Sequence, residues 1–380
     1  MIKNSVSDRN WILSKFDENK VKKATQELGV SEVLCRLLAI RNVEADQSLD
    51  FLNPKIKNSM PNPFLLKSMD EAVKLIIKHI KEESHICIYG DYDVDGASST
   101  SILARFLRNF TNNFFIFIPD RIQDGYGPNL KIFEDIASRG VKLIITVDCG
   151  TTSFEPIEYA KSKNIDVVVI DHHQSTETLP KANAIVNPNR FDETSNLTYL
   201  CAAGVAFLVL SGIVTRFREQ DFFKKKNIQE PDLLSYLDLV ALGTVCDVVP
   251  LQGLNRAFVF QGLKVLQKRN NLGIKTLSDV ANINSKISTY HLGYVIGPKI
   301  NAGGRIGKSD HGANLLLTED PEIAFKISKE LNQLNEKRKS IEGIILEEAI
   351  KIAKHKDNNP ILVVSSNTWH EGIIGIIASR

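Results

Sequence analysis

The sequence has few of the features that mark secreted, disulfide-rich or membrane proteins. Its five cysteines stand at positions 35, 87, 149, 201 and 246 without a Cys-x-x-Cys pair, so they read as reduced core residues. The N-terminus is polar and mixed in charge, unlike a signal peptide. The longest apolar stretch, residues 200–214, is shorter than the roughly 20 residues of a membrane span. We therefore expect a cytoplasmic protein with no membrane partner.

An excess of charge of one sign is also lacking. The 47 Lys and Arg residues nearly balance the 45 Asp and Glu residues, which leaves a net charge of +2. This balance argues against a histone-like binder of nucleic acids, although a local basic channel could still hold a strand. At 380 residues the chain can form two or three domains, each with its own core.

A regular alternation of helices and strands begins near residue 66. The pattern predicts helices at about 70–82, 97–110, 129–138 and 154–163, and strands at 86–89, 114–118, 143–147, 167–170 and near 184–186. Continuous apolar strands between helices indicate an α/β fold with a parallel sheet and helices on both faces. Ligands of such sheets bind outside the carboxyl ends of the strands.

The composition divides the chain into four regions. We expect an N-terminal helical region at 1–65, an α/β domain at 66–255, a helical connector region at 256–356, and the start of a second α/β domain at 357–380. The connector contains a Glu/Lys-rich helix at about 321–355, and residues 361–364 read as a strand. An apolar pattern at 372–377 has only just begun at the last residue, so we expect the second domain to be truncated.

Acidic and imidazole side chains follow three of the predicted strands directly. They are Asp91, Asp93 and Asp95 after strand 86–89, Asp148 after strand 143–147, and the run Asp171-His172-His173 after strand 167–170. If the first segment remains extended, its three carboxylates share one face and repel one another unless a cation lies between them. Because uncompensated buried charge is costly, the pattern predicts a metal site at this edge of the sheet.

Other interpretations of these acids remain open. The first loop resembles the start of an EF-hand, but the position that needs a bidentate glutamate is Ile102. The loop could instead be a solvated turn that caps the next helix, and Asp148 could cap its own helix. Asp247 lies among apolar residues, which suggests either a metal ligand or a buried salt bridge.

The mixture of ligands indicates the metal. Imidazole suits Mn²⁺, Fe²⁺ or Zn²⁺, whereas carboxylate oxygens suit Mg²⁺ or Mn²⁺. The combination favours Mn²⁺ or Mg²⁺, with two ions in the site. Two ions roughly 3.5–4 Å apart can activate a water molecule and hold a phosphoryl oxygen.

Two further segments are candidates for phosphate or substrate contacts. Arg121 and Tyr126 lie in segment 120–127 after a strand, at the same edge of the sheet. Asn301 and Arg305 lie in a Gly-rich, basic segment that reads as a loop, where the guanidinium could bind phosphate with two hydrogen bonds. Both segments could instead be simple turns. His370 precedes the terminal helical pattern, where a helix N-terminus could bind an anion.

The ordered set of motifs resembles the DHH phosphoesterase superfamily and, within it, the bacterial single-strand-specific DNA exonucleases. The resemblance rests on Tyr89-Gly-Asp-Tyr-Asp-Val-Asp-Gly96, Asp124-Gly-Tyr-Gly127, Val147-Asp-Cys-Gly150, Asp171-His-His173, Cys246-Asp-Val-Val-Pro250, Asn301-Ala-Gly-Gly-Arg305 and His370-Glu-Gly-Ile-Ile-Gly375. Similar segments at 37–41 and 51–54 extend it over nearly the whole chain.

The resemblance implies a function and a role for each residue. It implies a DHH catalytic domain at 66–255, in which the metal pair is bound by Asp93, Asp95, Asp148, His172 and Asp247, with Asp91 beside them and His173 in a catalytic role. It implies processive 5′→3′ hydrolysis of single-stranded DNA to 5′-mononucleotides in recombination and repair, with single-strand-binding protein and a helicase as candidate partners. Family members continue into a DHHA1 domain with a Gly-Gly-His segment and then an OB-fold, and this sequence contains neither segment.

Three rival functions would explain part of the sequence. A DHH phosphodiesterase for short oligonucleotides or cyclic dinucleotides is the nearest, but such relatives are more compact. A haloacid-dehalogenase-type phosphatase would explain Asp93-Val-Asp-Gly96 but not Asp171-His-His173. A binding protein with a decayed metal site would have lost ligands, and every expected ligand is present here.

Overall fold

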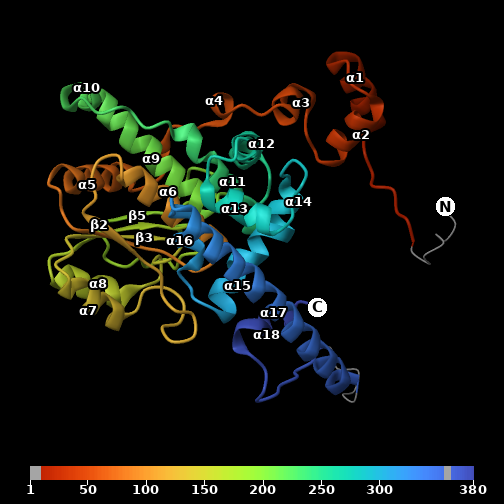
Figure 1. The fold of residues 1–380 in the computed structure, drawn as a ribbon. Helices are drawn as coiled ribbons and strands as arrows, with labels where there is room; N and C mark the ends of the chain where they lie inside the picture. Colours follow the sequence, from red (N-terminus) through yellow and green to blue (C-terminus); the bar gives the residue numbers. More distant parts are fainter. Residues whose placement is uncertain (1–9, 355–360) are drawn as a thin grey trace.

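The computed structural model describes residues 10–354 and 361–380. Its centre is a five-stranded parallel sheet in the order β2-β1-β3-β4-β5 (Figure 1). The strands are β1 (Ile86–Tyr89), β2 (Phe114–Phe117), β3 (Leu143–Val147), β4 (Asp166–Ile170) and β5 (Ala184–Val186). The predicted strands and their parallel arrangement are therefore confirmed.

Helices cover both faces of the sheet, as predicted. Alternate strand residues such as Ile88 and Ile145 join the core that packs on α5 (Met69–Lys81), α6 (Val94–Leu107) and α9 (Ala202–Glu219). Their neighbours, such as Tyr89 and Ile144, join a second core with α7 (Leu130–Ser138) and α8 (Phe154–Ser162). Because strand side chains alternate between faces, a continuous apolar strand is one that is buried on both sides.

One predicted boundary is wrong in a way that affects the site. Helix α6 begins at Val94 rather than at residue 97, so the acidic loop is not extended along its length. Asp93 is the N-cap and accepts a hydrogen bond from the backbone N–H of Gly96 at 2.9 Å. Asp95 lies in the first turn of the helix, where a carboxylate is favoured by the helix dipole. The three acids therefore do not share a strand face.

The second half of the described chain is helical. Its elements are α10 (Phe222–Lys226), η2 (Leu233–Tyr236), α11 (Leu237–Cys246), α12 (Gly253–Gln267), α13 (Leu272–Val280), α14 (Thr289–His291), η3 (Leu292–Ile296), α15 (Gly297–Ile306), α16 (His311–Leu317) and α17 (Pro321–Lys354). The Gly-rich segment that was predicted as a loop is thus mostly helix α15. Its Gly304 allows close packing, because a Cβ there would lie 2.9 Å from Cδ2 of Tyr92.

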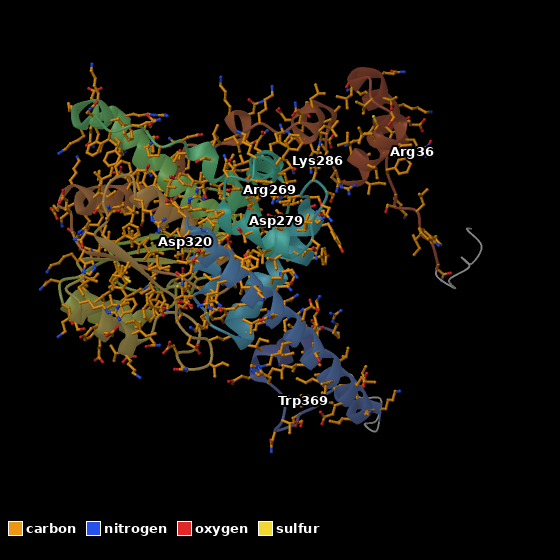
Figure 2. The ribbon with its side chains drawn as sticks, in the orientation of Figure 1. Arg36, Arg269, Asp279, Lys286, Asp320 and Trp369 are labelled. Atoms are coloured by element: carbon orange, nitrogen blue, oxygen red, sulfur yellow. The ribbon has the colours of Figure 1, made fainter. Side chains whose placement is uncertain are left out.

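The N-terminal helices are α1 (Glu18–Leu28), α2 (Glu32–Ile40), α3 (Ala45–Leu52), α4 (Ile56–Ser59) and η1 (Pro63–Leu65). Of these, α4 and η1 pack on the main core through Ile56 and Phe64. Helices α1 and α2 form a separate small unit that stands apart from the body (Figure 1). Val21, Ala24 and Cys35 give this unit its own small core, and Arg36 marks its position (Figure 2). The helical prediction for residues 1–9 lies outside the described residues.

The C-terminal segment packs on the far end of α17. Helix α18 (Glu371–Ala378) shares a core with that helix, and the indole of Trp369 donates a hydrogen bond to Glu348 at 2.9 Å (Figure 2). The strand predicted at 361–364 is wrong, because these residues form no strand in the described part of the chain. Residues 355–360 lie outside the described ranges. Among the described residues, no helix is both long and apolar enough to cross a membrane.

Candidate metal centre

The sheet brings the predicted acidic and imidazole residues together at its carboxyl edge. Three overlapping groups in the described residues each place their ligand atoms within 4.8 Å of one another. The groups are Asp148–His172–His173, Asp95–His172–Asp247 and Asp91–Asp93–Asp148. Because His172 and Asp148 each belong to two groups, the arrangement provides neighbouring positions that share ligands. Such sharing is what a pair of closely spaced cations requires.

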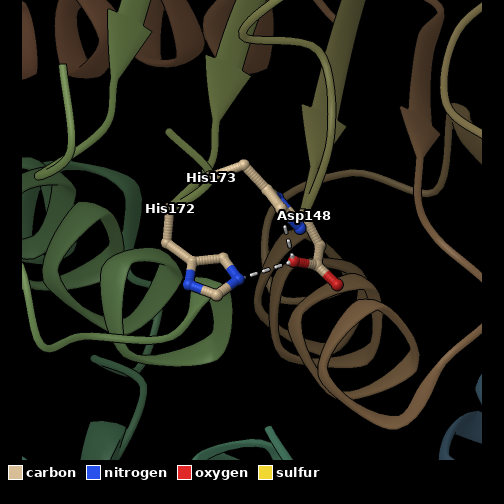
Figure 3. A group of neighbouring side chains, drawn as sticks. All are labelled: Asp148, His172 and His173. Carbon is tan, nitrogen blue, oxygen red and sulfur yellow. Dashed lines mark ion pairs between the residues drawn. The ribbon is translucent and has the colours of Figure 1, made fainter. Parts of the chain in front are cut away.

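His172 lies at the centre of the cluster. Its Nε2 atom is 3.2 Å from Oδ1 of Asp148 and 3.9 Å from Oδ2 of Asp95 (Figure 3 shows the contact with Asp148). Its Nδ1 atom faces the other way and lies 3.7 Å from Oδ2 of Asp247. Since Asp247 ends helix α11, this imidazole links the sheet edge to the helical half of the chain.

The backbone and the carboxylate of Asp148 both have features typical of a ligand-binding residue. Its backbone adopts a φ of 61°, in the left-handed region where only Asn, Asp and Gly are common. Its carboxylate is buried, and Oδ1 has no hydrogen-bond partner despite the nearby imidazoles. Burial, and then the carboxylates of Asp93 and Asp95, raise the pKa of Asp148 well above its usual value. A bound cation would oppose this shift, because it stabilises the charged carboxylate.

The acidic loop is held by long-range hydrogen bonds. The two carboxylate oxygens of Asp95 accept the backbone N–H groups of Ala202, at 2.6 Å, and Ala203, at 3.0 Å, at the start of α9. A Cβ at Gly243 would lie 2.5 Å from Oδ1 of Asp95, so this position admits only glycine. Asp95 is therefore fixed between two buried helices before any ligand binds.

Two further acids are strongly perturbed. Burial, reinforced by the charge of Asp93, raises the pKa of Asp91 to about 8. Burial, followed by the charges of Asp95 and Asp93, raises the pKa of Asp247 to about 8. Oδ1 of Asp91, like that of Asp148, is buried without a hydrogen-bond partner. These acids repel one another in the folded protein, and a divalent cation is the partner that would stabilise their charged forms.

Asp171 differs from the other acids because it is satisfied by hydrogen bonds. Its Oδ1 lies 2.8 Å from Nδ1 of His173, and its Oδ2 accepts the backbone N–H of Thr151 at 3.0 Å. Burial alone would raise the pKa of Asp171, but these hydrogen bonds outweigh it and hold the pKa at about 2. Asp171 therefore orients His173. It is itself held by Thr151, a contact between residues 20 positions apart that the sequence did not reveal.

His173 stands at the open side of the cluster and is half exposed. The hydrogen bond to Asp171 raises the pKa of His173 above its usual value. The hydroxyl of Tyr126 lies 3.2 Å from its Nε2 atom and donates a hydrogen bond to the backbone carbonyl of Asp148 at 3.2 Å. The structure thus places Tyr126 at the rim of the metal centre.

Among the other predicted substrate residues, Arg121 lies over Tyr92 of the acidic loop, whereas Arg305 has a different partner. The guanidinium of Arg121 lies 5.3 Å from the centre of the Tyr92 ring, and α15 packs on the same ring through Gly304. Arg305 is directed toward the C-terminal segment, where it donates a hydrogen bond to the carbonyl of Gly372 at 3.0 Å. The guanidinium of Arg121 therefore lies near the acidic loop, and Arg305 follows the residue through which α15 packs on that loop.

Asn301 and His370 have local partners in this structure. The side-chain oxygen of Asn301 accepts the backbone N–H of Val94 at 3.2 Å, so this residue braces the acidic loop. His370 is the N-cap of α18 and accepts the N–H of Gly372 through Nδ1 at 3.1 Å. Arg305 and His370 thus meet at Gly372, although they are far apart in the sequence.

Comparisons with known proteins agree with this site. The model of the DHH family, N-terminal domain, matches residues 85–244. The chain is 37% identical over 356 residues to the single-stranded-DNA-specific exonuclease RecJ of Haemophilus influenzae, a match that covers 92% of this chain and 61% of the relative. The chain therefore spans about three fifths of the length of this curated relative.

Solved structures agree as well. A crystal structure of exonuclease RecJ bound to manganese matches with a TM-score of 0.73 and 31% identity, over 83% of this chain and 77% of the other. RecJ of Thermus thermophilus in complex with Mn²⁺ matches with a TM-score of 0.79 and 28% identity, over 97% of this chain and 51% of the other. From the motifs, the fold and these matches together, we conclude that the chain belongs to the RecJ family of DHH proteins.

Proposed function

We propose that this chain is a metal-dependent exonuclease that hydrolyses single-stranded DNA in the 5′→3′ direction to 5′-mononucleotides. The observation that carries the proposal is the buried cluster in which His172 and Asp148 are each shared between groups of ligands. Such a cluster fits phosphodiester hydrolysis assisted by two ions. The names of the RecJ relatives support single-stranded DNA as the substrate.

The resident metal that we propose is Mn²⁺ or Mg²⁺. Ligation by Asp91, Asp93, Asp95, Asp148, His172 and Asp247 would supply mostly oxygen atoms and one imidazole. The buried Oδ1 atoms of Asp91 and Asp148, which lack hydrogen-bond partners, fit such ions. When bound, the ions would activate water and neutralise charge on the phosphoryl oxygens.

The protein groups have complementary roles in the proposed reaction. His173, oriented by Asp171 through Nδ1, would carry a proton at Nε2 for the leaving oxygen. Its raised pKa favours the protonated form that this role needs. Arg121 and Arg305 would hold phosphate groups of the strand next to the acidic loop.

Several wider predictions accompany this proposal. We propose a role in DNA recombination and repair, in the cytoplasm, with single-strand-binding protein and a helicase as partners. These wider predictions rest on the RecJ relatives, which are longer than this chain. No contact within the described residues contributes to them.

The test uses 5′-labelled single-stranded and duplex DNA with Mn²⁺, Mg²⁺ or EDTA. We expect metal-dependent release of mononucleotides from the single strand alone, and loss of that release in Asp93→Ala. Because Asp93 also caps α6, Asp93→Asn, which keeps a capping side chain, should lose activity too. The exposed Asp135→Asn is the control and should keep full activity. Equal cleavage of duplex DNA, activity that survives both Asp93 variants, or a preference for dinucleotides would contradict the proposal.

A further inference from the structure

A pair of exposed aromatic rings lies on an element that packs against the end of helix α11, and it has no part in the reaction described above. Tyr290 and Tyr294 stand one helical turn apart in α14 and η3, with ring centres 5.4 Å apart and planes at 28°. They are 63% and 75% exposed. Within residues 10–354 and 361–380, their ring contacts are with each other and with His291. Stacked rings that face water are an unusual use of aromatic surface in a folded protein.

The backbone that carries these rings packs directly against the end of helix α11. The thiol of Cys246 donates a hydrogen bond to the carbonyl of Leu292 at 3.4 Å. A Cβ at Gly297 would lie 2.5 Å from Sγ of the same cysteine, and one at Gly293 would lie 3.5 Å from Cγ1 of Val245. The next residue of that helix end is Asp247, a member of the metal cluster. The tyrosine pair therefore belongs to an element that supports the metal centre.

A second observation concerns the residue that follows this end of helix α11. Val248 follows Asp247 directly, is 85% exposed, and has a φ of 60°. A β-branched residue in the left-handed region is strained, and such strain clusters at functional sites. An apolar side chain is thus displayed to solvent directly after a metal-cluster acid, at the helix end on which the element with the two rings packs.

We propose that Tyr290 and Tyr294 form a platform on which unpaired bases of the DNA strand stack next to the metal centre. The inference rests on the proposed function, because it takes the strand as the substrate of the neighbouring site. Aromatic rings hold single strands by stacking, whereas bases paired inside a duplex do not expose their faces. The platform would therefore contribute to the preference for single strands as well as to affinity.

The size and surroundings of the pair favour bases over a protein partner. Two rings offer the area of one or two bases, whereas a stable protein interface buries about 800 Å² on each partner. The flanking residues are polar or basic, including Ser285, Lys286 and Thr289, and the position of Lys286 near α14 is visible in Figure 2. A lysine four residues before the first of the stacked rings suits a phosphodiester backbone.

Binding is measured by fluorescence anisotropy with a labelled 20-nucleotide adenine strand in EDTA, so that no cleavage occurs. The double variant Tyr290→Leu/Tyr294→Leu should bind about tenfold more weakly, because leucine removes the flat aromatic face. The double variant Tyr290→Phe/Tyr294→Phe keeps that face and should bind within twofold of the wild type. Phe325→Leu, a matched exposed aromatic on α17, should leave binding unchanged. Thermal unfolding of all variants should match the wild type because these side chains are exposed.

A set of strands, each with one abasic site at a different position, tests the stacking contact when their binding is compared. One or two positions should weaken wild-type binding about as much as the leucine double variant does, and those positions should not weaken the variant further. No sensitive position, equal loss in the phenylalanine and leucine variants, or wild-type affinity in the leucine variant would overturn the inference. Self-association of the wild type that the leucine variant loses would assign the pair to a protein interface instead.

This experiment separates the two proposals. If the chain binds strands through the platform but does not cleave them with metal, the platform stands and the proposed nuclease activity falls. If the chain cleaves strands while both tyrosines can be replaced without loss of binding, the platform falls and the nuclease activity stands.

Discussion

The two edges of the central sheet handle charge in opposite ways. At the amino edge, the carboxylate of Asp166 is compensated by His79 at 2.9 Å, by Asn183 at 2.8 Å and by Lys78 at 3.5 Å. At the carboxyl edge, Asp91, Asp95 and Asp148 are buried among other acids, and the pKa of each is raised. One edge is neutralised by the chain itself, whereas the other needs a cation from outside. Unpaired charge of this kind indicates a binding function, and paired charge indicates stability.

Among the changes that test this comparison, Asp148→Asn should have the largest effect. Asparagine tolerates the left-handed backbone and removes one negative charge, so the fold should be kept. We expect metal-dependent DNA cleavage to fall roughly a thousandfold, equivalent to about 4 kcal/mol of activation free energy. The metal-free variant should be more stable than the metal-free wild type, because repulsion among the acids is relieved. Urea denaturation with and without Mn²⁺ checks this, and a less stable metal-free variant would contradict it.

A smaller loss of activity is expected from Asp171→Asn. This change leaves every residue of the three metal groups in place and weakens the hydrogen bond that orients His173. Removal of such a supporting partner typically costs about 10- to 100-fold in activity or metal affinity. The pH profile of cleavage should also shift, because the raised pKa of His173 depends on Asp171. An unchanged profile would mean that His173 does not take part in proton transfer.

Metal affinity should depend on pH between about 6 and 8. Asp91 and Asp247 have raised pKa values of about 8, so below that pH each carboxyl must lose a proton before it binds a cation. Affinity for Mn²⁺ should therefore fall by roughly tenfold per pH unit for each proton displaced. Calorimetric titrations at pH 6, 7 and 8 measure this slope.

The same shifts set the sign of the pH effect on the metal-free protein. A carboxyl with a raised pKa keeps its proton in the folded state at a pH where the unfolded chain, with a pKa near 4, has released it. The stabilisation from these protons is therefore present at low pH and is lost as the pH rises toward 8. Metal-free stability that increases from pH 6 to pH 8 would contradict the shifts of Asp91 and Asp247.

The smallest effect on function is expected at the amino edge. His79→Ala removes a buried partner of Asp166 and should lower the free energy of unfolding by about 2 kcal/mol. Lys78→Ala removes an exposed partner and should cost about 0.5 kcal/mol. Neither change should alter the stabilisation gained on adding Mn²⁺. A loss of the metal response in either variant would show that the two edges are coupled.

Local patterns in the sequence were sufficient to predict the sheet and the position of its acids. Between residues 86 and 186, apolar runs that alternate with amphipathic helices predicted the strands, and parallel strands end at the same edge. Asp148 and His172 therefore had to be neighbours once their strands were parallel. The same kind of run at 361–364, which lies outside that alternation, forms no strand. The start of α6 was missed by three residues, because a carboxylate such as Asp93 fits both a loop and an N-cap.

Roles that depend on distant contacts could not be read from the sequence. Asn301 braces the acidic loop by binding Val94, and Asp95 is fixed by α9, both through contacts across more than a hundred residues. Tyr290 and Tyr294 were not identified either, because aromatic residues one turn apart in a helix usually belong to a core. Only the exposure of their rings distinguishes them from core residues.

The left-handed backbone of Asp148 restricts the evolutionary paths open to this centre. Glutamate would keep the negative charge, yet it would pay about 1–2 kcal/mol for this conformation, whereas asparagine and glycine fit the backbone but lose the charge. Glutamate, which is chemically closest to aspartate, is thus the substitution that the backbone disfavours. Descendants of this chain that lose the metal should carry Asn or Gly at this position, and descendants that keep it have aspartate as their one acidic choice.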